Sequence, residues 1–133
     1  MTEELVKTKE VLYRGKNVEE LKKLGVREVV KYLPSRARRA VLRNFDKIEK
    51  FIKKCEECKK NNKKIRTHLR EIVIVPKMIG YNVAVYNGKN YVEFEITSQM
   101  IGHRLGEFSH TTGKVAHNVA GIGATKSSRA LKK

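Results

Sequence analysis

The sequence predicts an α+β fold, in which a small three-stranded sheet with a packed helix follows a helical basic N-terminal region and precedes a flexible basic tail. Apolar residues recur at helical spacing before residue 60, and short β-branched runs flank an Asn-Gly turn between residues 72 and 96. From residue 109 onward the chain has five basic residues and no acid. A chain of 133 residues suits one domain, and we divide it into a helical region (1–62), an α+β core (63–108) and a tail (109–133).

The helical region carries the signals of three helical stretches. Asn17 ahead of Glu20 resembles a capping box, and Gly25 is well placed to end the helix that follows. Pro34 stops the second stretch, and Ser35 is expected to cap the third. The expected helices cover Val18–Leu24, Arg27–Leu33 and, with a break near Asn44, Ser35 to about Lys60.

The third stretch has an apolar side and a basic side. Alternating spacings of four and three place the apolar residues on one core face: Val41, Phe45, Ile48, Ile52 and Cys55. A basic stripe lies roughly opposite: Arg36, Arg39, Arg43, Lys47, Lys50 and Lys54. Several lysines follow an acid by four positions, which is also typical of an ordinary solvated surface. Residues 35–44 instead hold four arginines and no acid, and guanidinium groups bind phosphate in a bidentate manner. We therefore predict phosphate contacts at Arg36, Arg38, Arg39 and Arg43.

The segment after this helix is also basic. Residues 59–70 contain six basic residues and no acid: Lys59, Lys60, Lys63, Lys64, Arg66 and Arg70. Asn61 and Asn62 are typical of a linker. We expect a flexible arm that faces a nucleic acid.

The middle of the chain predicts strands. Ile72–Val75 is a short apolar run that ends at Pro76, consistent with a buried strand. Val83–Tyr86 and Tyr91–Ile96 flank a four-residue hairpin loop. This loop length sets Val85 opposite Val92 and Val83 opposite Phe94, whereas a two-residue loop would place a valine opposite a polar residue. The expected core face comprises Val83, Val85, Val92, Phe94 and Ile96.

A last helix and the tail complete the prediction. Thr97 is expected to cap a helix over Ser98–Leu105, with Gly106 at its end. The tail has little apolar periodicity, so it should not contribute to the core. Its glycines beside Lys126 and Arg129 allow the backbone to approach a sugar-phosphate chain closely.

The charge balance restricts the partner. Lysine and arginine total 30 against 14 acids, a net charge of +16 that favours a nucleic acid or an acidic membrane surface. The longest uncharged stretches have 11 residues, short of the roughly 20 that a membrane span needs. The acidic N-terminus is unlike a signal peptide, so we expect a cytoplasmic protein without a membrane partner. RNA binding is favoured because the amphipathic helix needs its apolar side for the core.

The motifs for catalysis and metal binding are incomplete. Cys55 and Cys58 have the spacing of half a zinc site, but Cys55 also continues the apolar stripe, so we interpret both as buried or half-buried side chains. Gly121–Ser127 lacks the glycine before lysine that a phosphate loop requires. His103 and Glu107 lack an accompanying nucleophile. We predict no enzyme, no metal site and no cofactor.

The two tyrosines beside the hairpin loop allow two interpretations. Tyr86 and Tyr91 can stack on unpaired bases, as aromatic residues do in RNA-binding proteins. They can also form a cross-strand pair within the sheet, which is the more common role of such residues.

Three ordered motifs carry a family resemblance. They are Arg-Glu-Ile-Val-Ile-Val-Pro-Lys-Met-Ile-Gly at 70–80, Ala-Val-Tyr-Asn-Gly-Lys at 84–89 and Met-Ile-Gly-His-Arg-Leu-Gly-Glu-Phe-Ser at 100–109. This set closely resembles the S-nineteen family of small-subunit ribosomal proteins. Nearly the whole chain resembles the archaeal and eukaryotic type of this family. The additional segments that carry this resemblance are Tyr13–Gly15, Ser35–Arg39, Gly121–Thr125 and Ser127–Arg129.

The resemblance implies a structural constituent of the small-subunit head that binds the 3′ major domain of the ribosomal RNA. It also implies contact with the neighbouring S-thirteen protein, and a tail directed toward the decoding region, A-site transfer RNA and bridge elements of the large subunit. Together with the basic arm, the motifs predict these RNA contacts: Lys63, Lys64, Arg66, His68, Arg70, Asn87, Gly88, Lys89, His103, Arg104 and Gly106. In the tail, the predicted contacts to transfer RNA and the decoding region are Lys126, Ser127, Ser128 and Arg129. The alternative is a free RNA- or DNA-binding regulator or an RNA chaperone.

Overall fold

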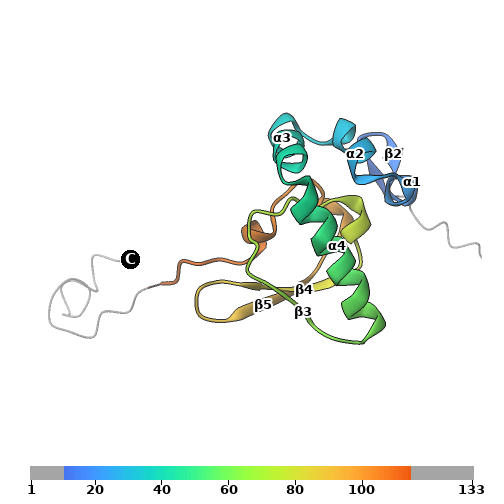
Figure 1. Cartoon of the computed structure of the whole chain (residues 1–133). Coiled ribbons are helices and arrows are strands. Elements are labelled where there is room, and N and C mark those ends of the chain that lie inside the picture. Colours follow the sequence, from blue (N-terminus) through green and yellow to red (C-terminus); the bar gives the residue numbers. More distant parts are fainter. Residues whose placement is uncertain (1–10, 115–133) are drawn as a thin grey trace, which may run out of the picture.

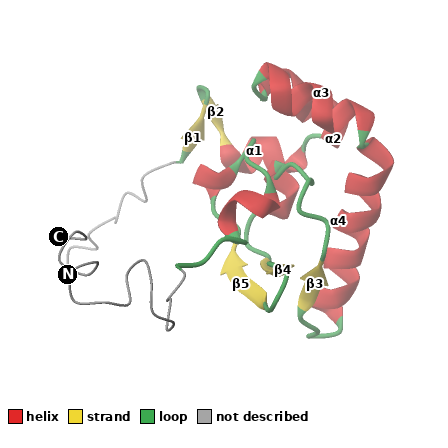
Figure 2. Cartoon of the chain, turned by 90° about the vertical axis from the view of Figure 1, so that its left-hand side faces the viewer, coloured by secondary structure: helices red, strands yellow, loops and turns green. Residues whose placement is uncertain are grey.

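The computed structural model describes residues 11–114. Its centre is a sheet of β3 (Ile65–Thr67), β4 (Asn82–Tyr86) and β5 (Tyr91–Glu95), together with the long helix α4 (Phe45–Lys60). Figure 1 shows the shorter N-terminal helices gathered near one end of α4, and Figure 2 shows α4 standing beside β3. The predicted α+β fold, with a helix packed on a three-stranded sheet, is confirmed.

Two short strands that were not predicted precede the N-terminal helices, and these helices are separated close to the expected residues. The N-terminal elements are β1 (Leu12–Tyr13), β2 (Lys16–Asn17), α1 (Val18–Lys23), α2 (Val26–Val29) and the 3-10 turn η1 (Val30–Tyr32). The predicted cap at Asn17 is confirmed, because its side chain accepts a hydrogen bond from the backbone N–H of Glu19 at 3.2 Å. Gly25 separates α1 from α2, and its N–H donates to Glu28 Oε2 at 3.1 Å.

The predicted break at Asn44 is also confirmed. It divides α3 (Ser35–Arg43) from α4, and Asn44 adopts φ −108° and ψ 25°. Ser35 is the first residue of α3 and makes no capping bond, so the predicted serine cap is wrong; Pro34 occupies the position before it. The apolar faces of both helices enter the core through Ala37, Val41, Ile48, Phe51, Ile52 and Cys55.

The hairpin has the predicted register. Val83 lies opposite Phe94 and Val85 opposite Val92, and the loop closes through a hydrogen bond from the N–H of Asn87 to the carbonyl of Asn90. Val83, Val85 and Ile96 are buried, whereas Val92 and Phe94 are only half-buried. Both β3 and β5 are edge strands, but α4 packs beside β3, so the core-facing side chains of β5 are less covered.

The third strand of the sheet is not the one that the sequence predicted. It is β3, which runs parallel to β4, and not the predicted strand Ile72–Val75. Ile72–Val75 is fully buried but pairs outside the sheet: the carbonyl of Ile74 accepts from Gly102, and that of Ile72 accepts from Leu105. The expected flexible arm is therefore wrong at Ile65–Thr67, where buried Ile65 and Thr67 alternate with exposed Arg66.

The predicted helix over Ser98–Leu105 is also wrong. The segment forms two 3-10 turns, η3 (Ser98–Met100) and η4 (Leu105–Phe108), and a third turn, η2 (Pro76–Met78), follows Val75. Gly102 adopts φ +85° and donates its N–H to Ile74, which interrupts any helix there. The segment 101–105 therefore turns back to pair with 72–74, which positions Arg104 for the site described next.

No helix in residues 11–114 combines the length and apolar character needed to cross a membrane.

Candidate nucleic-acid interface

Four arginines surround a hollow on the surface of α3. Helical spacing of three and four places Arg36, Arg39 and Arg43 on one face, and the turn after Gly102 brings Arg104 to the same place. Together with Ala40, Asn44 and Glu71 they line a volume of about 180 Å³, which we call the arginine hollow. Within residues 11–114 the three ion pairs involve no arginine, so these guanidinium groups remain available to an anion.

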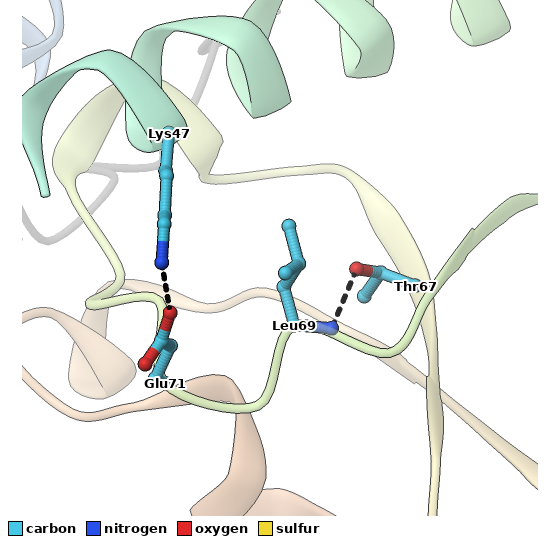
Figure 3. Close-up of polar contacts among 4 residues, drawn as sticks. All are labelled: Lys47, Thr67, Leu69 and Glu71. Atoms are coloured by element: carbon cyan, nitrogen blue, oxygen red, sulfur yellow. Dashed lines mark hydrogen bonds and ion pairs between the residues drawn. The ribbon is translucent and has the colours of Figure 1, made fainter.

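The carboxylate that lines the arginine hollow is already engaged. Lys47 Nζ on α4 lies 2.8 Å from Glu71 Oε1, and a dashed line in Figure 3 marks this contact. This hydrogen bond and the positive charge of Lys47, with a smaller effect from Arg104, lower the pKa of Glu71. The Thr67 hydroxyl accepts the N–H of Leu69 at 3.0 Å, in a local turn that leads from β3 toward Glu71. Figure 3 also marks this contact.

Arg38 differs from the other arginines of α3. Its Nη2 donates to the carbonyls of Lys31 at 3.1 Å and Leu33 at 3.4 Å, so it ties α3 to the preceding turn. It lines a neighbouring groove that contains the exposed side chain of Leu42 and shares Arg39 and Arg43 with the arginine hollow. The sequence placed all four arginines of residues 35–44 in one group, and the structure brings three of them to the arginine hollow.

Arg70 and Gly106, both predicted RNA contacts, form close contacts within the protein. Arg70 Nη1 donates to the carbonyl of Tyr86 at 2.7 Å, and Nη2 donates to that of Gly106 at 2.8 Å and to that of Ser109. A Cβ added at Gly106 would lie 3.0 Å from both Cβ and O of Arg70. Ser109, the first residue of the expected tail, is fully buried, and its hydroxyl donates to the carbonyl of Val85 at 3.3 Å.

The outer face of the sheet carries a second group of predicted residues. His68, Tyr86 and Tyr91 have their ring centroids 4.6 to 5.5 Å apart. Tyr91 Oη and His68 Nε2 lie 2.7 Å apart, and the Arg66 guanidinium lies 5.4 Å from the ring centre of Tyr91. Tyr86 and Tyr91 are directly opposite in the ladder, so the predicted cross-strand pair is confirmed.

The remaining predicted residues are spread over the surface. In the hairpin loop, Asn87 Oδ1 accepts the N–H groups of Lys89 and Asn90 at 2.9 and 2.8 Å, which shapes the loop at Gly88 and leaves Lys89 exposed. Lys63 is exposed, and Lys64 pairs with Glu93 at 2.8 Å. His103 Nδ1 lies 2.7 Å from Glu107 Oε2. The predicted contacts Lys126, Ser127, Ser128 and Arg129 lie outside the described residues.

The two cysteines occupy the predicted apolar positions. Cys55 is fully buried in the core, and Cys58 is half-buried. Burial, followed by the proximity of Cys58, raises the pKa of Cys55 to about 12, so the thiol stays protonated. Zinc binds the thiolate, which this environment disfavours. In residues 11–114 no group of three or more potential ligands is close enough together to hold a metal ion.

Sequence reasoning placed Arg104 among the contacts but did not place it beside α3. Glu71 and Lys47, which control the charge of the arginine hollow, were also missed as a pair. They are 24 positions apart, and no local spacing signals such a contact.

Comparisons with known proteins identify the family of the chain. Residues 39–117, more than half of the chain, match the family model "Ribosomal protein S19". The small ribosomal subunit protein uS19 of Saccharolobus solfataricus is 48% identical over 120 residues, which cover 87% of this chain and 86% of the relative. The uS19 protein of Metallosphaera sedula is 44% identical over 124 residues (90% and 89%), and that of Methanococcoides burtonii 41% over 120 residues (90% and 86%).

These relatives are archaeal, in agreement with the predicted archaeal and eukaryotic type. The matched family consists of structural, non-enzymatic ribosomal proteins, which confirms the prediction that the chain is not an enzyme. By the extent of the match and the identity to its relatives, the chain belongs to the ribosomal protein S19 family.

Proposed function

We propose that this protein is a structural constituent of the small ribosomal subunit and binds ribosomal RNA through a surface centred on the arginine hollow. The observation that carries the proposal is the convergence of Arg36, Arg39, Arg43 and Arg104, with their neighbouring carboxylate Glu71 neutralised by Lys47. Guanidinium groups match phosphate geometry, and RNA phosphates would offset the repulsion among the four cations.

The proposed contact surface extends beyond the arginine hollow. It includes Lys63 and Arg66, the hairpin-loop residues Asn87, Gly88 and Lys89, and His103, all of which are solvent-accessible. Arg38 and Lys64 contribute charge while holding their intramolecular partners. Arg70 and Gly106 have a different role in this proposal, because the Arg70 guanidinium donates to backbone carbonyls, including that of Gly106, and the Gly106 N–H donates to the carbonyl of Arg70.

The family resemblance supports finer proposals. It supports a position in the head of the small subunit, on the 3′ major domain of the RNA and beside the S-thirteen protein, in a cytoplasmic ribosome. It also supports contacts of Lys126, Ser127, Ser128 and Arg129 with A-site transfer RNA or the decoding region. Truncation after Lys114 tests the tail: we expect RNA binding by the core to remain and A-site transfer-RNA binding to weaken in reconstituted subunits.

Co-sedimentation with small subunits after a high-salt wash tests the function. A constituent of the subunit remains in the 30S peak, whereas a free regulator or RNA chaperone is released. The triple substitution of Arg36, Arg39 and Arg43 by Gln should reduce the retained fraction. Release of the wild-type protein by the wash would reject the ribosomal role and favour the regulator.

A further inference from the structure

We propose that the rings of His68, Tyr86 and Tyr91, together with the guanidinium of Arg66, form a stacking site for an unpaired nucleobase of RNA. The inference rests on the proposed RNA-binding function and adds base recognition to phosphate contact. It concerns a surface separate from the arginine hollow, since none of these four residues lines that hollow.

The four side chains come from three segments that the fold brings together. Arg66 on β3 is registered with Ala84 on β4, and Tyr86 on β4 with Tyr91 on β5, so these side chains share the outer face of the sheet. His68 follows β3 directly, and its ring centre lies 4.6 Å from that of Tyr86 and 5.5 Å from that of Tyr91. Cross-strand pairing alone accounts for the two tyrosines, but not for the addition of His68 and Arg66.

The polar ends of the rings are held in place. The hydroxyl of Tyr86 donates to the carbonyl of Gly88 at 2.9 Å, and the hydroxyl of Tyr91 lies 2.7 Å from His68 Nε2. Ring orientation is therefore set before a ligand arrives, which lowers the entropy cost of binding. Tyr91 is 36% exposed and His68 is also exposed, so a flat ligand can reach the cluster.

The charges around the cluster suit the backbone on either side of a stacked base. Arg66 lies over the ring of Tyr91, and Lys89 is exposed in the adjoining hairpin loop. The neighbouring acid on the same face, Glu93, is paired with Lys64 at 2.8 Å, and the hydrogen bond and charge of Lys64 lower the pKa of Glu93.

These features select the class of ligand. Bases within a duplex already stack on one another, whereas an unpaired base in a loop or bulge exposes its π face to aromatic and guanidinium groups. Stacking of one base on an aromatic side chain changes affinity by roughly 5- to 100-fold. Phosphate contacts, in contrast, are shared by paired and unpaired RNA.

The test compares two RNA probes bound to the full chain. One is a fluorescein-labelled 16-base-pair RNA duplex, and the other is the same duplex with three unpaired adenosines in a central bulge; fluorescence anisotropy at 150 mM salt gives both dissociation constants. We expect wild-type protein to prefer the bulged RNA by roughly 5- to 100-fold. Tyr91→Val, which keeps a strand-forming residue, and His68→Ser, which alters a loop position, should each reduce this preference.

Two matched variants complete the test. Tyr91→Phe keeps the ring and should keep the preference, and Arg36→Gln should weaken binding of both RNAs equally. Equal wild-type affinity for the two probes would overturn the stacking site while leaving RNA binding intact, as would full preference in both Tyr91→Val and His68→Ser. Absence of binding to either probe would overturn the proposed RNA-binding function as well.

Discussion

Arginine has two different roles in this protein. In the arginine hollow its side chains are exposed, whereas Arg70 donates to the backbone carbonyls of Tyr86, Gly106 and Ser109, an arrangement that we call the clamp. Arg36, Arg39 and Arg43 of the hollow and Arg70 of the clamp lie in basic stretches that lack an acid, 35–44 and 59–70, whereas Arg104 comes from a later segment. Arg70 donates to three backbone carbonyls, whereas within residues 11–114 the side chains of Arg36, Arg39 and Arg43 donate to no protein group. The difference lies in the neighbouring backbone, since the carbonyls of Tyr86, Gly106 and Ser109 surround the guanidinium of Arg70, and the carbonyls of α3 are largely used within the helix.

A basic stretch therefore does not by itself define a nucleic-acid interface. An arginine that satisfies backbone carbonyls stabilises the fold, and removing it costs free energy of unfolding. An arginine on an exposed helix face costs little to remove but carries the affinity for a polyanion.

The largest effect should come from breaking the clamp. Arg70→Met keeps the aliphatic length but leaves three carbonyls without their charged donor, which should lower the free energy of unfolding by about 3 to 4 kcal/mol. Urea denaturation measures the loss. The matched change Arg36→Met should alter stability by at most about 0.5 kcal/mol, and equal losses in the two variants would contradict the distinction.

The arginine hollow should control salt dependence. Replacing Arg36, Arg39 and Arg43 by Gln should reduce the slope of log affinity against log salt by about 2 to 3, so that binding weakens roughly 16- to 64-fold less between 50 and 200 mM salt. Titrations with a ribosomal RNA fragment measure the slope. The control replaces three α4 lysines that follow acids by four positions, Lys50, Lys53 and Lys60, with Gln. An equal reduction in this control would show that total charge, and not the hollow, sets the slope.

A smaller loss of stability should follow from crowding the clamp. Gly106→Ala places a Cβ 3.0 Å from the Arg70 backbone oxygen, and the required shift should cost about 1 to 2 kcal/mol. Gly113→Ala is the control, because nothing lies within 4 Å of its added Cβ. Thermal denaturation compares the two, and an unaffected Gly106→Ala protein would show that the contact yields easily.

The smallest effect should come from the acid beside the arginine hollow. Glu71→Gln removes a negative charge near the arginines and should raise RNA affinity roughly 2- to 5-fold. Because Lys47 lowers the pKa of Glu71, the wild-type carboxylate stays charged at neutral pH, and the difference should disappear only when pH falls below the ordinary carboxyl range. Glu19→Gln on α1 removes an equal charge elsewhere and should change affinity less. A larger increase with Glu19→Gln would exclude a local effect.

Several local features were predictable because short-range chemistry sets them. The cap at Asn17, the break at Asn44 and the four-residue hairpin loop each depend on residues within a few positions of one another. The basic face of α3 follows equally from helical spacing.

The errors lie where pairing connects distant segments. Ile72–Val75 and Ile65–Thr67 both had strand character, and their place depended on which segments offered free backbone groups. β4 pairs with β3, and Ile72–Val75 pairs with the turn around Gly102, which prevents the expected helix there.

By itself, the sequence determined the α+β class, the hairpin register, the buried cysteine and the family, because periodicity, turn chemistry and motif order are local properties. Only the tertiary structure decided which arginine side chains donate to protein carbonyls and which stay available to an anion. Arg104 reaches α3 because residues 101–105 turn back onto 72–74, and Arg70 is enclosed because the ends of β4 and η4 present their carbonyls to it. A guanidinium binds whichever acceptors surround it, and those acceptors are assembled from segments far apart in the chain.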